Sequence, residues 1–215
     1  LSYCDKNAIL AEVIVVDDGS SDSTASVAKS IGGSRVIVLK NRVNRGKGFS
    51  VHRGLLAASH RLILMTDSDL ATPIEELAVL LSWREKNYDI IIGSRNIGRS
   101  KARASQSFFR SLLGKAFPFI VNLLVLRGFK DTQCGFKLFT KQAAEQITRL
   151  ARIQGYCFDV EMLYIGKKLG YRIKEVAVAW IDQPESKLNP LRDGPRMIAE
   201  LAAIRRNSLQ GKYEL

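Results

Sequence analysis

Four short apolar runs recur in the first half of the chain, and each of them ends in polar residues. Their sequences are EVIVVDDGS (residues 12–20), RVIVLKN (35–41), RLILMTDSD (61–69) and DIIIGSR (89–95). Nearly every position within a run is apolar, as in strands whose two faces are both covered by helices. The pattern therefore predicts four strands of a buried, mostly parallel sheet.

Helical patterns follow the four runs, which gives the strand–helix alternation of an α/β fold. We expect helices over Ser21–Ile31, Gly48–Ser59, Pro73–Lys86 and Ser105–Leu126. Pro73 suits a first helical position, and the acidic residues after it suit a first turn. Ligands of such sheets bind outside the carboxyl ends of the strands, so the polar ends of the four runs predict one site along one edge.

The second half of the chain has a different rhythm. We expect a loop over KDTQCGFKLFT (130–140), helices near Lys141–Leu150 and Val160–Leu169, a strand over Tyr171–Trp180 and a basic helical tail from about Leu191. Gly170 suits the end of the second of these helices.

No repeat or linker divides the sequence, so we expect a single domain over residues 1–215. Only about twelve residues precede the first expected strand, and this predicts an N-terminal truncation that removes the opening strand. Three cysteines without CxxC spacing favour neither a disulfide framework nor a zinc site, and they fit a reducing compartment. Arg110, Lys115 and Pro118 interrupt the longest apolar stretch, so no membrane span is predicted.

Two acidic turns end the first and third runs. Asp67 and Asp69 stand in D-x-D spacing, which lets both carboxylates approach one hard cation such as Mg²⁺ or Mn²⁺. The alternative is that Asp69 caps the helix that follows. Asp17 and Asp18 precede Gly19 in the other turn, where a carboxylate can bind a nucleobase or ribose or can belong to an ordinary helix cap.

The net charge of +12 suggests a polyanionic partner. In NRGKGFS (44–50), two glycines allow close backbone approach, and Arg45 and Lys47 offer positive charge to a diphosphate. The spacing fits neither GxGxxG nor a P-loop. Charge alone would also suit a nucleic-acid-binding domain, but the acids at 17–18 and 67–69 would repel its phosphates, so we expect no nucleic-acid partner.

In their order along the chain, these motifs resemble those of the family 2 glycosyltransferases with the GT-A fold. The resemblance runs through VIVVDDGSSDST, NRGKG, TDSDLATPIEEL, IIIGSR, QSFFRSLLGKAF, KDTQCGFKLF, CFDVEMLYIGKKLGYRIKEVAVAW and ESKL. It implies a Rossmann-like nucleotide-diphospho-sugar transferase. The likeness is strongest to members that transfer glucose from UDP-glucose to dolichyl or polyprenyl phosphate with inversion. Mannosyl transfer to dolichyl phosphate and a bacterial polyprenyl-phosphate or polysaccharide glycosyltransferase are the alternatives.

On the donor side, the resemblance implies that Asp18 contacts the uridine and that Asp17 assists it. It also implies that Asp67 and Asp69 hold the nucleotide and a Mg²⁺ or Mn²⁺ ion, with Asp69 as the more direct ligand and a catalytic residue.

On the acceptor side, the resemblance implies contacts with the lipid phosphate from Arg95, Lys137 and Lys187, and Gln133 is expected to shape the same loop. Arg95 and Lys137 are also expected to act in catalysis. The alternative for each of the three cations is a solvated surface side chain.

No acidic residue lies between Asp89 and Asp131, whereas eight lysines and arginines do. The strongly apolar stretch Phe108–Leu126 is embedded among them. This combination predicts that residues 96–130 form a membrane-interface segment, with a buried helix beside a solvated basic loop as the alternative. The resemblance implies a place on the cytosolic face of the endoplasmic reticulum membrane, or on the plasma membrane in a prokaryote.

Overall fold

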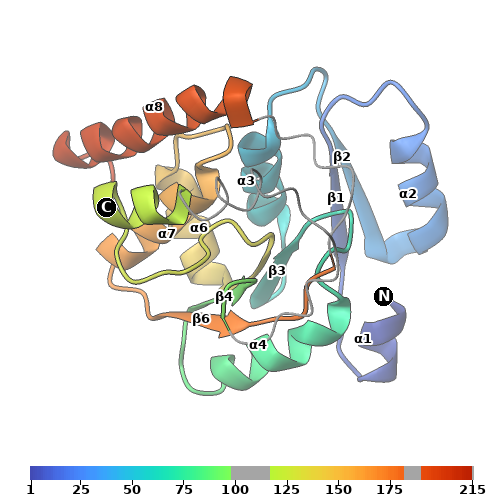
Figure 1. Ribbon diagram of the computed structural model, residues 1–215. Coiled ribbons are helices and arrows are strands. Elements are labelled where there is room, and N and C mark those ends of the chain that lie inside the picture. The colour runs from blue at the N-terminus through green and yellow to red at the C-terminus, as the bar shows by residue number, and fades with distance from the viewer. Residues whose placement is uncertain (98–116, 182–189, 215) are drawn as a thin grey trace.

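The computed structural model describes residues 1–97, 117–181 and 190–214. Its strands are β1 (Val13–Asp17), β2 (Val36–Lys40), β3 (Leu62–Thr66), β4 (Ile90–Ser94), β5 (Phe136–Thr140) and β6 (Ile173–Ala177). Its helices are α1 (Ser2–Lys6), α2 (Thr24–Gly32), α3 (Lys47–Ala57), α4 (Leu77–Arg84), α6 (Lys141–Leu150), α7 (Phe158–Lys168) and α8 (Pro190–Leu209). Residues 33–35 and 74–76 form 3₁₀ turns, and residues 117–124 are helical. Figure 1 shows the strands between layers of helices.

The strands form two sheets rather than one. β1 and β2 pair in parallel, and a second sheet has the order β3-β5-β4-β6. In the second sheet β4 and β6 are parallel, while β5 runs antiparallel to both of its neighbours. The expected α/β class is confirmed, and the four runs of the first half all form strands. The division into two sheets was not expected.

The expectation of a loop over residues 130–140 was wrong for its second half. Phe136–Thr140 forms β5, which lies inside the larger sheet between β3 and β4. Lys137 made this segment look polar, but its side chain is fully buried and its charge is paired. A buried lysine with a carboxylate partner is compatible with an interior strand, and the partner is distant in sequence.

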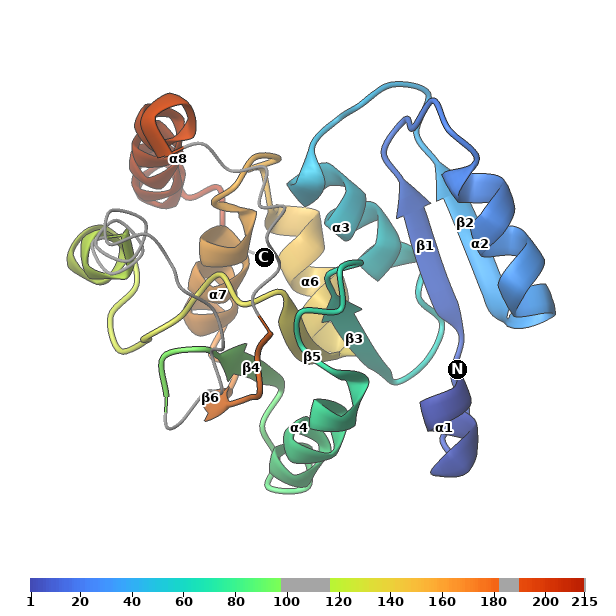
Figure 2. The ribbon, with the colours of Figure 1, turned by 45° about the vertical axis from the view of Figure 1, so that its right-hand side comes forward.

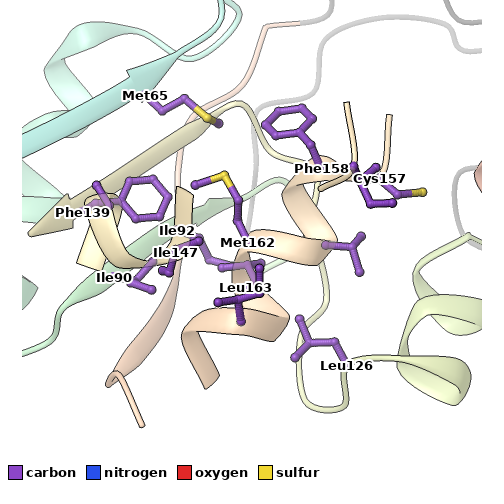
Figure 3. Close-up of a cluster of buried hydrophobic side chains, with 14 of the residues drawn as sticks. Met65, Ile90, Ile92, Leu126, Phe139, Ile147, Cys157, Phe158, Met162 and Leu163 are labelled. Carbon is purple, nitrogen blue, oxygen red and sulfur yellow. The ribbon is translucent and has the colours of Figure 1, made fainter. Parts of the chain in front are cut away.

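Alternate residues of β4 face two separate apolar clusters, as the two-residue period of a strand requires. Ile90 and Ile92 belong to the larger cluster with α3, α6 and α7, whereas Ile91 belongs to the cluster beneath α4. Figure 3 shows Ile90 and Ile92 beside Phe139, Ile147, Met162 and Leu163. This double coverage holds the carboxyl end of β4 in a fixed place.

The C-terminal helix α8 lies at the side of the molecule beyond α7 (Figures 1 and 2). Met197, Leu201 and Ile204 of α8 are buried in the larger cluster. The helix also binds the start of α7, because Glu200 accepts a hydrogen bond from the backbone N–H of Cys157 at 2.9 Å. The basic tail expected from the sequence is therefore an integral part of the core.

Candidate functional site

The polar ends of three strands gather at one edge of the fold. Asp17 is the last residue of β1, Asp67 directly follows β3, and Arg95 directly follows β4. Because β5 is antiparallel, its amino end lies at this edge too, and the Asp67 N–H donates to the carbonyl of Gly135 at 3.0 Å. The site expected at the carboxyl ends of the strands is therefore assembled from both sheets.

Asp18 shapes the loop that leads into α3. One carboxylate oxygen accepts hydrogen bonds from the Asn41 side chain and the Arg45 N–H, and the other accepts from the Gly46 N–H at 2.8 Å. Burial raises the pKa of Asp18, but these donors outweigh it and leave the pKa below its ordinary value. The carboxylate predicted to bind uridine is thus already engaged by backbone groups.

Asp17 has a different environment one residue earlier. Its Oδ1 accepts a hydrogen bond from the Ser20 N–H at 2.8 Å, and Ser20 lowers the pKa of the carboxyl group. Its Oδ2 is buried and has no hydrogen-bond partner among the described residues, although the Lys40 ammonium lies 3.8 Å away. A buried carboxylate oxygen without a donor is costly in free energy, so it is suited to a donor that a ligand brings.

The acidic turn after β3 carries an ion pair with the glycine-rich loop. Lys47 Nζ lies 2.7 Å from Asp67 Oδ1. Burial lowers the pKa of Lys47, but the carboxylates of Asp67, Asp159 and Asp69 outweigh that effect and raise it. This contact connects the first turn of α3 to the end of β3 and so joins the two sheets.

Asp69 accepts a hydrogen bond from the Ala71 N–H at 3.0 Å, which closes a local turn. It does not cap α4, because the cap position of that helix is Glu76. Gly135 leaves the room that the acidic turn needs, since a Cβ atom there would lie 1.9 Å from Asp67 Oδ2. Both acids of the D-x-D motif thus lie in the turn that directly follows β3.

Lys137 is turned into the protein interior. Its ammonium donates to the Cys134 carbonyl and to Asp159 Oδ1, each at 2.5 Å, and its side chain has no exposed area. Burial raises the pKa of Asp159 against the opposing effect of Lys137. In this conformation Lys137 has no exposed ammonium to offer an acceptor, and it holds Asp159 beside the acidic turn instead.

Arg95 forms a bidentate ion pair with the buried carboxylate of Asp131. Its Nε and Nη2 donate to Asp131 at 2.7 and 2.9 Å, and its backbone N–H donates to the same side chain at 3.0 Å. Burial alone would raise the pKa of Asp131, but the Arg95 guanidinium holds it below its ordinary value. About a third of the Arg95 side chain remains exposed. Gln133, the neighbouring predicted residue, donates from its side chain to the Tyr156 carbonyl at 3.1 Å.

Three supporting residues of this edge received no firm role from the sequence. They are Asp131, Asp159 and Gln154, whose carbonyl accepts a hydrogen bond from the Gly48 N–H at 3.0 Å. Asp159 stands at the start of α7, where an acid is as typical of a helix terminus as of a site. Their roles depend on contacts with residues far away in the sequence, so no local signal distinguishes them.

Two predicted features lie wholly or partly outside the described residues. Lys187 is one, and residues 98–116 of the expected membrane-interface segment are the other. Of the described part of that segment, Phe119 and Leu123 are 69% and 62% exposed. Within the described ranges, no helix is both long and apolar enough to cross a bilayer.

No group of three or more histidine, cysteine or acidic side chains could enclose a metal ion in the parts of the chain that the structure describes. Asp67 and Asp69 offer two carboxylates, the kind of oxygen donor that Mg²⁺ and Mn²⁺ prefer. A site with so few protein ligands fits an ion that also binds the phosphates of its substrate. The donor set therefore fits a divalent cation that is shared with a nucleotide.

Comparison with known proteins gives a consistent picture. A family model described as "Glycosyl transferase family 2" matches residues 2–148. The chain is 39% identical over 213 residues to the dolichyl-phosphate beta-glucosyltransferase of Dictyostelium discoideum. This match covers 95% of this chain and 65% of the relative. It is 37% identical over 230 residues to the Homo sapiens protein of the same name, covering 100% of this chain and 71% of the relative. The chain thus spans about two thirds of the length of these relatives.

A solved structure shares the fold at lower sequence identity. It is the glucosyl-3-phosphoglycerate synthase of Mycobacterium tuberculosis in complex with Mn²⁺, UDP-glucose and phosphoglyceric acid. The TM-score is 0.61 at 21% identity, and the match covers 100% of this chain and 74% of that one. The arrangement of strands and helices is therefore shared with this synthase.

Proposed function

The chain belongs to glycosyl transferase family 2, and from this premise we propose that it transfers glucose from UDP-glucose to dolichyl phosphate. The names of the curated relatives, at 37–39% identity, support both the sugar and the acceptor. The observation that carries the proposal is the contact of Lys47 with Asp67, which brings a basic loop and an acidic turn together at the sheet edge. A nucleotide diphosphate and a divalent cation need these two kinds of charge side by side.

The base of the donor is assigned to Asp17, with Asp18 in a supporting role. The buried Oδ2 of Asp17, which has no hydrogen-bond partner among the described residues, is suited to accept a hydrogen bond from a nucleobase N–H. Asp18 instead fixes the backbone at Arg45 and Gly46, and through it the position of the cations in this loop. This reverses the order of importance that the resemblance implies for the two acids.

The diphosphate of the donor is assigned to Arg45 and Lys47, and the metal to Asp67 and Asp69. A bound Mg²⁺ or Mn²⁺ supplies positive charge that stabilises the departing diphosphate. The side chains of Arg45 and Lys47 contribute charge that is in place before the donor binds. Their backbone is held there because the Gly46 N–H donates to Asp18 and the Gly48 N–H donates to the Gln154 carbonyl. The Arg45 guanidinium packs over the Phe49 ring at 4.0 Å, which holds its stem against α3.

In the chemical step, an acceptor phosphate oxygen attacks the anomeric carbon of glucose from the face opposite UDP. The new carbon–oxygen bond forms as the bond to the diphosphate breaks, so the configuration inverts and UDP leaves. A phosphate monoester has a second pKa near 6 and is mostly dianionic at neutral pH. No side chain has to remove a proton from it.

The acceptor phosphate is assigned to Arg95 and Gln133, and the resemblance adds Lys187, which lies outside the described residues. Part of the Arg95 side chain is exposed, and its orientation is fixed because both Nε and Nη2 donate to the Asp131 carboxylate. Lys137 acts as a positioning residue for Asp159 rather than as a direct contact. The exposed apolar residues Phe119 and Leu123 suit contact with the membrane surface in which a dolichyl chain is embedded. The cytosolic face of the endoplasmic reticulum is the proposed location.

The test is transfer of radiolabelled glucose from UDP-glucose to dolichyl phosphate by the full-length protein, with and without EDTA. We expect transfer that requires the metal and that the substitution D69A abolishes, while D5A, which removes a distant surface acid paired with Arg35, leaves it intact. Parallel assays use GDP-mannose and UDP-GlcNAc as donors. Transfer of mannose without glucose, or transfer that persists in EDTA, would disprove the proposal.

A further inference from the structure

The ammonium of Lys47 lies against a carboxylate that is a candidate ligand for a metal ion. It lies 2.7 Å from Asp67 Oδ1, the acid that begins the D-x-D turn, and Asp69 and Asp159 act on it electrostatically. A divalent ion shared by Asp67 and Asp69 would compete with this ammonium for the same carboxylate. Two cations cannot hold one carboxylate oxygen closely without strong mutual repulsion.

The position of Lys47 is fixed by its backbone. The Gly46 N–H donates to Asp18 on one side of it, and the Gly48 N–H donates to the Gln154 carbonyl on the other. Gly46 has a φ of 95°, and a Cβ atom there would lie 2.9 Å from the Gln154 oxygen. The loop is therefore built for glycine at this position, and the lysine stem leaves the backbone at a defined point.

Electrostatics gives a reason for the pairing with Asp67. Lys47 is the first residue of α3, and a cation is unfavourable at the amino terminus of a helix. The nearby carboxylates compensate for this placement in the free protein. A nucleotide diphosphate at the same helix terminus would compensate for it equally well, because phosphate groups are favourable there. Lys47 thus has two possible anionic partners, one within the protein and one on the donor.

We propose that Lys47 takes the place of the divalent cation until the donor binds, so that the cation and the nucleotide bind as one cooperative unit. When the diphosphate arrives, the ammonium exchanges Asp67 for phosphate oxygens and leaves the carboxylate to the incoming ion. The free protein therefore binds the metal weakly, and the nucleotide strengthens that binding. This inference rests on the proposed donor site but not on the identity of the acceptor.

The experiment measures binding of Mn²⁺ by electron paramagnetic resonance, first without nucleotide and then with saturating UDP. For the wild-type protein we expect weak binding alone and binding about ten-fold tighter with UDP. The variant K47M should bind Mn²⁺ alone about ten-fold more tightly than the wild type and should gain less from UDP than the wild type does, because only the phosphate ligands of the ion are then added. The variant K47R keeps the charge and should resemble the wild type.

A matched control is K141M, which removes an equally exposed lysine paired with Glu145 on α6. It should leave both Mn²⁺ affinities unchanged, and thermal melts should show that all variants fold. Mn²⁺ affinity that K47M leaves unchanged or weakens in the absence of UDP overturns the inference, as does wild-type affinity that does not respond to UDP. Loss of glucosyl transfer with the coupling intact would disprove the proposed function alone.

Discussion

Asp17 and Asp18 are adjacent acids with different hydrogen-bond partners. Three donors from other parts of the chain engage Asp18, whereas one oxygen of Asp17 is buried and has none among the described residues. In the sequence the two residues form one motif, and their separate roles become visible only when the loop before α3 packs against them. The structure therefore gives the two adjacent acids different surroundings, and only Asp18 is bound to the loop before α3.

The first prediction compares the substitutions D17N and D18N. D17N should weaken UDP binding roughly 10- to 100-fold, because it removes a charged acceptor, and should leave stability nearly unchanged. D18N should lower the free energy of unfolding by about 1–3 kcal/mol, because it disrupts the hydrogen bonds to the loop. Calorimetric titration with UDP and denaturant unfolding measure the two effects. Equal UDP binding by D17N and the wild type would contradict the assignment.

His52 supplies a pH-dependent contribution to stability. Its Nε2 is buried without a hydrogen-bond partner among the described residues, and burial lowers its pKa from 6.5 to about 4. Between these values the unfolded chain binds a proton that the folded chain does not. Stability from this residue is therefore complete above pH 6.5 and declines as the pH falls toward 4.

The expected size of this effect is at most roughly 3 kcal/mol in the free energy of unfolding. Urea unfolding at several pH values between 7 and 4 measures it. The difference between the wild type and H52Q isolates His52 from the acids that titrate in the same range, and H60Q is the matched control at the other histidine. Parallel profiles for the wild type and H52Q would show that His52 does not contribute.

At the scale of elements, the apolar runs predict β1–β4 well because each strand carries its own signal. β5 was missed because its signal depends on a partner: Lys137 looks polar until Asp159 of α7 neutralises it in the interior. The order of the strands was equally hidden, since the antiparallel β5 separates β3 from β4. The acidic turn follows β3, whereas its contacts come from Gly135, just before β5, and from Lys47 of α3.

The turn before β5 gives a prediction at this scale. In G135A the new Cβ atom would lie 1.9 Å from Asp67 Oδ2, so the carboxylate has to move. We expect turnover to fall on the order of a hundred-fold, because catalytic groups tolerate displacements of about 1 Å poorly. Thermal melts should show that the protein remains folded. The control G194A places the same methyl group where, apart from the adjoining residues and nearby backbone of α8, no atom of the described residues lies within 4 Å, and it should retain full activity.

At the scale of the whole molecule, a chain of hydrogen bonds connects the C-terminal region to the glycine-rich loop at the start of α3. The Tyr213 hydroxyl donates to Glu161 Oε1 at 2.6 Å, and the other carboxylate oxygen accepts from the N–H groups of Arg152 and Ile153. The next residue, Gln154, holds the Gly48 N–H. Glu161 has no exposed area, so these contacts satisfy a buried carboxylate.

The substitution Y213F tests this connection. It leaves Glu161 without one donor in the interior, so the free energy of unfolding should fall by about 1–3 kcal/mol. The control Y171F removes a hydroxyl that donates to Gln146 at 2.6 Å in a less buried place, and it should cost less than about 1 kcal/mol. Denaturant unfolding measures both. An equal loss in the two variants would show that the buried cluster contributes nothing special.

The division of the strands into two sheets has a consequence for handling the protein. β1 and β3 are each hydrogen-bonded to one neighbouring strand, β2 and β5 respectively, and both pack against α3 as Figure 2 shows. On its other side each has backbone groups with which no described strand pairs, and another extended segment could be added there. We expect the protein in concentrated solution to self-associate through these edges of β1 and β3. Charged substitutions along the two strands should improve solubility without altering the loop before α3.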